Sequence, residues 1–158
     1  MIPARRNILL IDDDPAIRQI LLHILEEENY FVLAVANGVE VFTLAETTKF
    51  DLVLLDLNMP VKDGWETFEQ LSLKNPLLPI ILITAYPHLF SSALASGASA
   101  LLEKPLDFVQ LFYTIRNLLE TNGRRVPDKL HGAAFDISSH PAENDRQAAK
   151  RRNQIEDR

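Results

Sequence analysis

Five short runs of consecutive apolar residues, separated by longer amphipathic stretches, constrain this chain more than any other feature of its sequence. The runs cover residues 8–11, 31–35, 52–55, 80–83 and, with weaker apolar character, 98–102. Continuous hydrophobicity, as opposed to strict alternation, is typical of parallel strands that are buried on both faces. Between the runs, apolar residues recur at helical spacing, as at Ile17, Ile20, Leu21 and Ile24. The pattern therefore predicts an α/β fold in which five strands alternate with five helices.

This alternation also predicts how the sheet is built. Right-handed crossovers place helices on both faces of a parallel sheet, which gives a doubly wound (βα)5 unit. We expect the flavodoxin-like strand order 2-1-3-4-5, one of the common orders for such sheets. The first helix has a clear start signal, since Asp14 can cap it and Pro15 suits its first position.

The pattern ends near residue 120, and the rest of the chain is polar. Residues 1–120 are predicted to form one domain of ordinary size. Residues 121–158 carry only scattered large apolar residues, so we expect a disordered or marginally helical tail, with any helix over 143–155. These 38 residues (158 minus 120) are too few and too polar to fold an output domain unaided, so a single-domain protein is expected.

Composition and charge exclude several classes of protein. The absence of cysteine excludes disulfides, thiolate metal sites and cysteine nucleophiles. No apolar run approaches the roughly 18 residues of a membrane helix, and none suits a signal peptide, so we expect a cytoplasmic protein without membrane contact. Residues 1–120 hold 8 Lys and Arg against 16 Asp and Glu, a net charge of −8, which disfavours a nucleic-acid surface. The basic cluster at 150–152 is interpreted as part of a solvated tail.

Polar side chains follow the predicted strands at the point where each one ends. Asp12 and Asp13 follow the first strand, Asp56 closes the third, Thr84 ends the fourth and Lys104 follows the fifth. The carboxyl ends of parallel strands share one edge of the sheet, where ligands bind in such folds. Three carboxylates placed together repel one another unless a cation lies between them, and hard oxygen ligands suit Mg²⁺. A lysine and a hydroxyl beside them suit phosphate oxygens, so the edge is interpreted as a site for Mg²⁺ and phosphate.

Four ordered motifs resemble the receiver domain of two-component response regulators. They are I-L-L-I-D-D-D-P-A-I-R at 8–18, D-L-V-L-L-D-L-N-M-P-V-K-D-G at 51–64, I-L-I-T-A-Y at 81–86 and G-A-S-A-L-L-E-K-P at 97–105. The resemblance covers residues 6–120. It implies that Asp56 accepts a phosphoryl group from a histidine kinase or histidine phosphotransferase, and that the protein signals by altered partner binding and is not an enzyme.

The same resemblance implies roles for the other residues at this edge. Asp12, Asp13, Asp56 and the backbone carbonyl of Asn58 are expected to hold Mg²⁺. The Thr84 hydroxyl and the Lys104 ammonium are expected to engage the phosphoryl oxygens, and the Lys104–Pro105 peptide is expected to be cis. Asp63–Gly64 is expected to form the turn into the third helix, with glycine supplying backbone freedom.

The sequence departs from the family pattern at two places. Leu101 stands three residues before Lys104, where receivers usually carry the aromatic ring of their conformational switch. The stretch from Thr84 to Gly97 is short, so we expect a truncated or reoriented fourth helix. Tyr86, two residues past Thr84, is expected to hinder the water that hydrolyses an acyl phosphate.

Two other functions stay open. Leu101 favours a degenerate receiver that acts as a constitutive interaction module. A Mg²⁺-dependent phosphohydrolase using Asp56 as nucleophile is disfavoured, because Asn58 stands where such enzymes need a second acid. A purely structural alternative is that residues 12–14 are an acidic helix start that interacts favourably with the helix dipole. This alternative does not explain Asp56 and Lys104.

Overall fold

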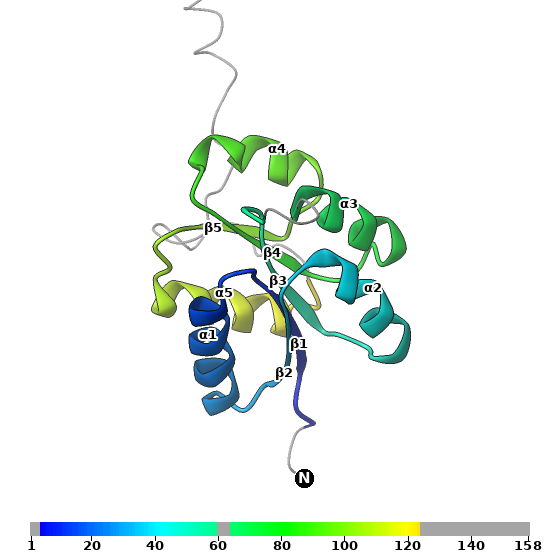
Figure 1. The fold of residues 1–158 in the computed structure, drawn as a ribbon, viewed down its shortest axis with the longest axis vertical. Helices are drawn as coiled ribbons and strands as arrows, with labels where there is room; N and C mark the ends of the chain where they lie inside the picture. Colours follow the sequence, from blue (N-terminus) through cyan, green and yellow to red (C-terminus); the bar gives the residue numbers. More distant parts are fainter. Residues whose placement is uncertain (1–3, 60–63, 124–158) are drawn as a thin grey trace, which may run out of the picture.

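The computed structural model describes residues 4–59 and 64–123. In this part of the chain, five parallel strands form one sheet in the order β2-β1-β3-β4-β5. The strands are β1 (Asn7–Ile11), β2 (Phe31–Val35), β3 (Leu52–Asp56), β4 (Ile80–Thr84) and β5 (Ala100–Glu103). The helices are α1 (Pro15–Glu27), α2 (Gly38–Thr47), α3 (Gly64–Lys74), α4 (Phe90–Ala95) and α5 (Phe108–Glu120), with a 3-10 turn η1 (Pro87–Leu89) before α4 (Figure 1). The predicted fold class and strand order are confirmed.

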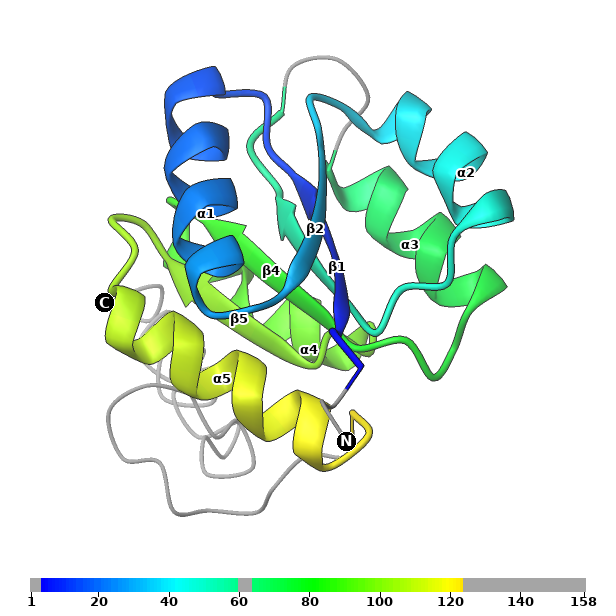
Figure 2. The same cartoon turned by 90° about the horizontal axis from the view of Figure 1, so that it is seen from below.

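The helices cover both faces of the sheet, which explains why the strands are continuously apolar. Leu9 and Ile11 of β1 pack in one core layer with buried residues of α2, α3 and α4. Ile8 and Leu10 pack in the other layer with buried residues of α1 and α5. Figure 2 shows the sheet between these two groups of helices. Neighbouring residues of β1 enter opposite layers, and a strand buried on both faces in this way needs apolar residues at consecutive positions.

Local signals at the helix ends agree with the sequence. Asp14 caps α1, its side chain accepting hydrogen bonds from the backbone N–H groups of Ala16 and Ile17, and Pro15 is the first helical residue. The last helix, α5, ends at Glu120, and the chain then turns at Gly123, whose φ of 78° lies in the left-handed region. Most of the predicted tail, residues 124–158 with its basic cluster, lies outside the described residues.

The fourth helix is short, as expected. It has six residues and ends at Ala95, and Gly97, two residues further on, has a left-handed φ of 96°. The N–H groups of Gly97 and Ala98 donate to the carbonyls of Leu94 and Ala93, which closes the helix in a Schellman arrangement. This closure occupies residues 97 and 98, so β5 begins at Ala100 and not at residue 98 as the apolar run predicted.

Among the described residues, none of the helices is both long and apolar enough to cross a membrane.

Candidate functional site

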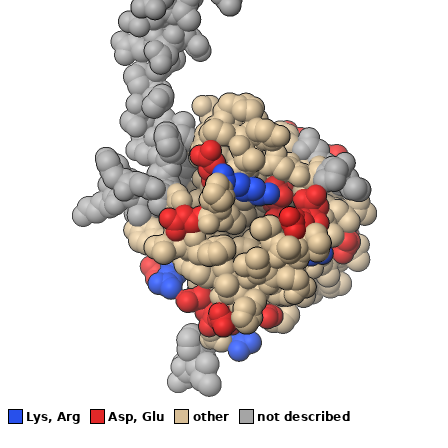
Figure 3. Space-filling view, turned by 60° about the vertical axis from the view of Figure 1, so that its left-hand side comes forward, with Lys and Arg blue, Asp and Glu red and all other residues tan. Residues whose placement is uncertain are grey.

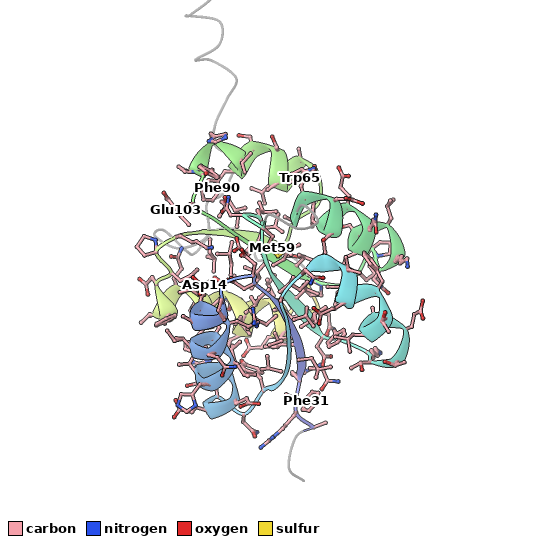
Figure 4. All side chains as sticks on the ribbon, viewed as in Figure 1. Asp14, Phe31, Met59, Trp65, Phe90 and Glu103 are labelled. Carbon is pink, nitrogen blue, oxygen red and sulfur yellow. The ribbon has the colours of Figure 1, made fainter. Side chains whose placement is uncertain are left out.

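The polar residues predicted from the strand ends meet at one edge of the sheet. Asp56 is the last residue of β3, Thr84 is the last residue of β4, Asp12 follows β1 and Lys104 follows β5. In Figure 4, Asp14, Met59 and Glu103, which are sequence neighbours of these residues, lie in the left and central part of the view. Phe31, at the start of β2, lies near the bottom, away from all three. The sheet therefore gathers residues that are up to 92 positions apart (104 minus 12).

Asp56 is held on both of its carboxylate oxygens. The Lys104 ammonium lies 2.9 Å from Oδ2, and the backbone N–H of Asn58 donates to Oδ1 at 2.8 Å. Asp56 is 1% exposed, so this ion pair is shielded from water on the carboxylate side. The Lys104–Pro105 peptide is cis, as expected, and the backbone N–H of Lys104 donates to the Thr84 carbonyl at 2.9 Å. Lys104 is thus anchored to β4 while its side chain reaches the end of β3.

Asp12, Asp13 and Asp56 form a cluster of carboxylates at this edge. One carboxylate oxygen from each of the three residues lies within 4.8 Å of those from the other two. Asp12 Oδ1 accepts a hydrogen bond from the Asp14 N–H at 2.9 Å, whereas its Oδ2 is buried and has no hydrogen-bond partner among the described residues. In the space-filling view, acidic side chains group around a basic side chain on one face of the described part (Figure 3).

The surroundings of Asp12 disfavour its ionised form. Burial raises the pKa of the Asp12 carboxyl from 3.8 to about 6, and the charges of Asp56 and Asp13 add to the rise. The Asp14 N–H and the Lys104 ammonium act in the opposite direction. A buried oxygen without a partner, beside two further carboxylates, is an arrangement that a hard divalent cation such as Mg²⁺ satisfies. The residues present therefore fit the metal that the sequence indicated.

Asn58 has a second role at this edge that its sequence position did not reveal. Its side-chain Oδ1 accepts a hydrogen bond from the Ala85 N–H at 3.0 Å and lies 3.4 Å from the Thr84 hydroxyl. The Thr84 hydroxyl is fully buried and accepts from the Tyr86 N–H at 3.0 Å. These contacts join the loop after β3 to the loop after β4. Which way a loop side chain turns is set by tertiary packing, and the sequence carries no signal for it.

Arg18 supports the acidic pair from the first turns of α1. Its guanidinium Nη1 donates to the backbone carbonyl of Asp12 at 2.7 Å. Arg18 was not predicted as a site residue, and its one signal in the sequence is its position six residues after Asp12, on the first helix.

Gly64 is needed for space. A Cβ atom at this position would lie 2.4 Å from the Asp56 carbonyl oxygen and 2.6 Å from the Leu57 Cα. Its missing side chain lets α3 begin against the end of β3. The expected role of Asp63–Gly64 in the turn into this helix stays a prediction. Asp63, the other residue of the expected turn, lies outside the described residues.

Leu101 and Tyr86, which the sequence singled out for different reasons, differ in exposure. Leu101 is 4% exposed and lies in the core layer that faces α4. Tyr86 is 52% exposed, and its ring lies against that of His88 with 5.8 Å between centroids. Leu101 therefore packs as an ordinary core residue, while the Tyr86 ring stands at the surface beside the end of β4.

Comparisons with known proteins agree on one family. The family model of the response regulator receiver domain matches residues 8–116. A transcriptional regulatory protein from Klebsiella oxytoca, ZraR, is 37% identical over 115 residues, which are 72% of this chain and 26% of that protein. The Bacillus subtilis alkaline phosphatase synthesis regulator PhoP is 35% identical over 102 residues, 63% of this chain and 42% of that protein. The chain thus spans less than half the length of these relatives.

Solved structures that superpose on this chain belong to the same family. A CheY-like receiver domain protein from Methanospirillum hungatei superposes with a TM-score of 0.71 at 32% identity, covering 75% of this chain and 97% of that one. The response regulator TrrA from Thermotoga maritima, in complex with Mg²⁺ and BeF, gives a TM-score of 0.66 at 34% identity, with 72% and 98% of the two chains covered.

Proposed function

Because the chain belongs to the response regulator receiver domain family, we propose that Asp56 accepts a phosphoryl group from a histidine kinase or histidine phosphotransferase in the cytoplasm. The observation that carries this proposal is the buried Asp56 carboxylate, paired with Lys104 at 2.9 Å and flanked by Asp12 and Asp13. The phosphorylated protein then signals through altered partner binding.

In the proposed transfer, a carboxylate oxygen of Asp56 forms a bond to phosphorus as the P–N bond of phosphohistidine breaks, and the leaving imidazole takes up a proton. Lys104 and the Asn58 N–H hold the carboxylate in place and oppose the negative charge that the phosphoryl group adds. The Thr84 hydroxyl supplies a further donor at the neighbouring strand end. Asp12, Asp13, Asp56 and the Asn58 carbonyl would hold Mg²⁺, which when bound neutralises charge on the carboxylates and the phosphoryl oxygens.

The proposal is tested by titrating the protein with beryllofluoride in the presence of Mg²⁺. Trp65 is the sole tryptophan, and it lies next to Gly64 at the start of α3, directly after the phosphoacceptor loop. We expect a saturable change in its fluorescence that requires both Mg²⁺ and beryllofluoride and is lost in Asp56→Asn. A native protein that gives no change at millimolar ligand would contradict the proposal.

Receiver domains are phosphoacceptors and not classical enzymes. A phosphohydrolase is the second candidate chemistry for a nucleophilic aspartate beside Mg²⁺. Asn58 offers no acid to protonate a leaving group, so we propose that small phosphomonoesters are not turned over. The degenerate-receiver hypothesis rests on Leu101 and predicts no change in partner binding on phosphorylation. Action without an attached output domain stays a prediction.

Tyr86→Ala should shorten the lifetime of the phosphorylated protein roughly three- to ten-fold, equivalent to about 0.65–1.4 kcal/mol in activation free energy. The half-exposed ring of Tyr86 follows the end of β4, whose neighbour β3 ends in Asp56, and we expect the hydrolytic water to approach from this side. Loss of the adduct is followed by intact mass after the phosphodonor is removed. Tyr86→Phe keeps the ring and should keep the native lifetime; an unchanged or longer lifetime in Tyr86→Ala would refute this steric role.

A further inference from the structure

We propose that the side-chain amide of Asn58 is a built-in competitor for the donors that a phosphoryl group on Asp56 would use, so that phosphorylation must displace it. The inference rests on the proposed phosphoacceptor function of Asp56 and assigns a positioning role to a side chain. The backbone carbonyl of Asn58, expected at the metal, is not involved in this role.

The contacts place one neutral oxygen in front of two donors. Asn58 Oδ1 accepts from the Ala85 N–H at 3.0 Å and lies 3.4 Å from the Thr84 hydroxyl. The backbone N–H of the same residue donates to Asp56 Oδ1 at 2.8 Å. Asn58 therefore connects the phosphoacceptor carboxylate directly to the end of β4.

The sheet brings these donors close to any group attached to Asp56. β3 and β4 are neighbours, and Asp56 is paired in register with Ile83, the residue before Thr84. The oxygens of an attached phosphoryl group would lie at this strand end and are charged acceptors. Hydrogen bonds to charged acceptors are roughly twice as strong as those between neutral groups. The Ala85 N–H and the Thr84 hydroxyl would therefore donate to the phosphoryl oxygens in place of the amide oxygen.

The exchange links chemistry at Asp56 to the segment that leads into α4. In the described structure, the Asn58 amide ties Ala85 and Thr84 to the loop after β3, and Tyr86 and η1 follow directly. When the amide is displaced, its hydrogen bonds to Ala85 and Thr84 are lost, and both residues hydrogen-bond to the phosphoryl group instead. The free energy of the lost amide contacts opposes phosphorylation, and the amide therefore sets how readily the resting protein is activated.

The experiment compares native protein with Asn58→Ala by two readouts. The first is hydrogen exchange of the Ala85 amide, followed by NMR without metal or phosphoryl analogue. The second is the beryllofluoride concentration that half-saturates the protein at fixed Mg²⁺, followed by Trp65 fluorescence. We expect Ala85 exchange to be roughly ten-fold faster in the variant, and half-saturation at roughly three- to ten-fold lower beryllofluoride, because a competing acceptor is gone.

Two control variants separate competition from general effects of mutation. Asn58→Asp keeps an oxygen in front of the same donors, so Ala85 should stay protected and beryllofluoride should bind no more tightly than to native protein. Asn37 follows the edge strand β2 and caps α2 by accepting from the N–H groups of Val39 and Glu40. Asn37→Ala removes the same amide from another pair of donors, and should lower stability without changing either readout.

The possible results separate the competitor role of Asn58 from the phosphoacceptor function of Asp56. Faster Ala85 exchange together with tighter beryllofluoride binding in Asn58→Ala supports the competitor role. Binding that is unchanged or weaker in Asn58→Ala, while native protein responds normally, overturns the competitor role alone. A native protein that does not respond to beryllofluoride and Mg²⁺ overturns the phosphoacceptor function, and the competitor role with it.

Discussion

Asp12→Asn should raise the free energy of unfolding of the metal-free protein by about 3 kcal/mol at pH 8. The Asp12 carboxyl has a pKa of about 6 in the folded protein, against 3.8 for the ordinary group. At a pH between these two pKa values, the folded state holds more protons than the unfolded state. The free energy of unfolding of the native protein therefore falls as the pH rises from about 4 to 6. Above pH 6 the cost of the buried charge is complete. Asparagine keeps an oxygen for the Asp14 N–H and carries no charge.

Urea unfolding of both proteins in EDTA, at pH 4 and at pH 8, checks this expectation. The gain should be present at pH 8 and close to zero at pH 4. Asp14→Asn is a matched control, because Asp14 is exposed at the N-cap and asparagine caps equally well. Added Mg²⁺ should stabilise native protein much more than Asp12→Asn. A variant that is less stable than native protein at pH 8 without metal would contradict the electrostatic description of this cluster.

Lys104→Met should lower the free energy of unfolding by about 2–3 kcal/mol and slow phosphorylation of Asp56 by roughly 100-fold. The ammonium is the partner of a carboxylate that is 1% exposed, and removing one partner of a buried ion pair leaves an uncompensated charge. The Lys104 side chain is 29% exposed, so water screens part of its contribution, and we expect a loss at or below the lower end of the range of about 3–5 kcal/mol for buried pairs. Phosphorylation slows because the charge added at Asp56 loses its nearest cation.

A double-mutant cycle separates the ion pair from general packing. Asp56→Asn removes the charge that Lys104 compensates, so Lys104→Met should cost much less in that background, with a coupling free energy above about 1 kcal/mol. Lys74→Met is the matched control. Lys74 lies over the Phe42 ring at the surface, and its loss should cost no more than about 1 kcal/mol. Additive effects of the two substitutions at the site would show that the 2.9 Å contact contributes little.

The sequence was sufficient to predict the fold and the residues that meet at one edge of the sheet, for a simple physical reason. Buried parallel strands need unbroken apolar runs, and a polar residue at the end of such a run is placed at a known edge of the sheet. Asp12, Asp56, Thr84 and Lys104 were each found in this way. Crossover handedness predicted a doubly wound sheet, and the order 2-1-3-4-5 is one of the common strand orders of such sheets.

The features that the sequence did not predict depend on how segments distant in the sequence pack against one another. The direction of the Asn58 side chain follows from how two loops meet, and the need for glycine at position 64 follows from the distance between α3 and the end of β3. The start of β5 was placed two residues early, because the apolar residue Ala98 closes α4 and does not extend the strand. The contributions of residues 60–63 and 124–158 lie outside the described structure.

The central claim is that Asp56 is the phosphoacceptor, and intact mass spectrometry tests it most directly. Native protein and Asp56→Asn are incubated with acetyl phosphate, with Mg²⁺ and with EDTA. We expect one phosphoryl group on native protein, only in the presence of Mg²⁺, and none on the variant. An adduct that forms equally on Asp56→Asn, or none on native protein that binds Mg²⁺, would contradict it.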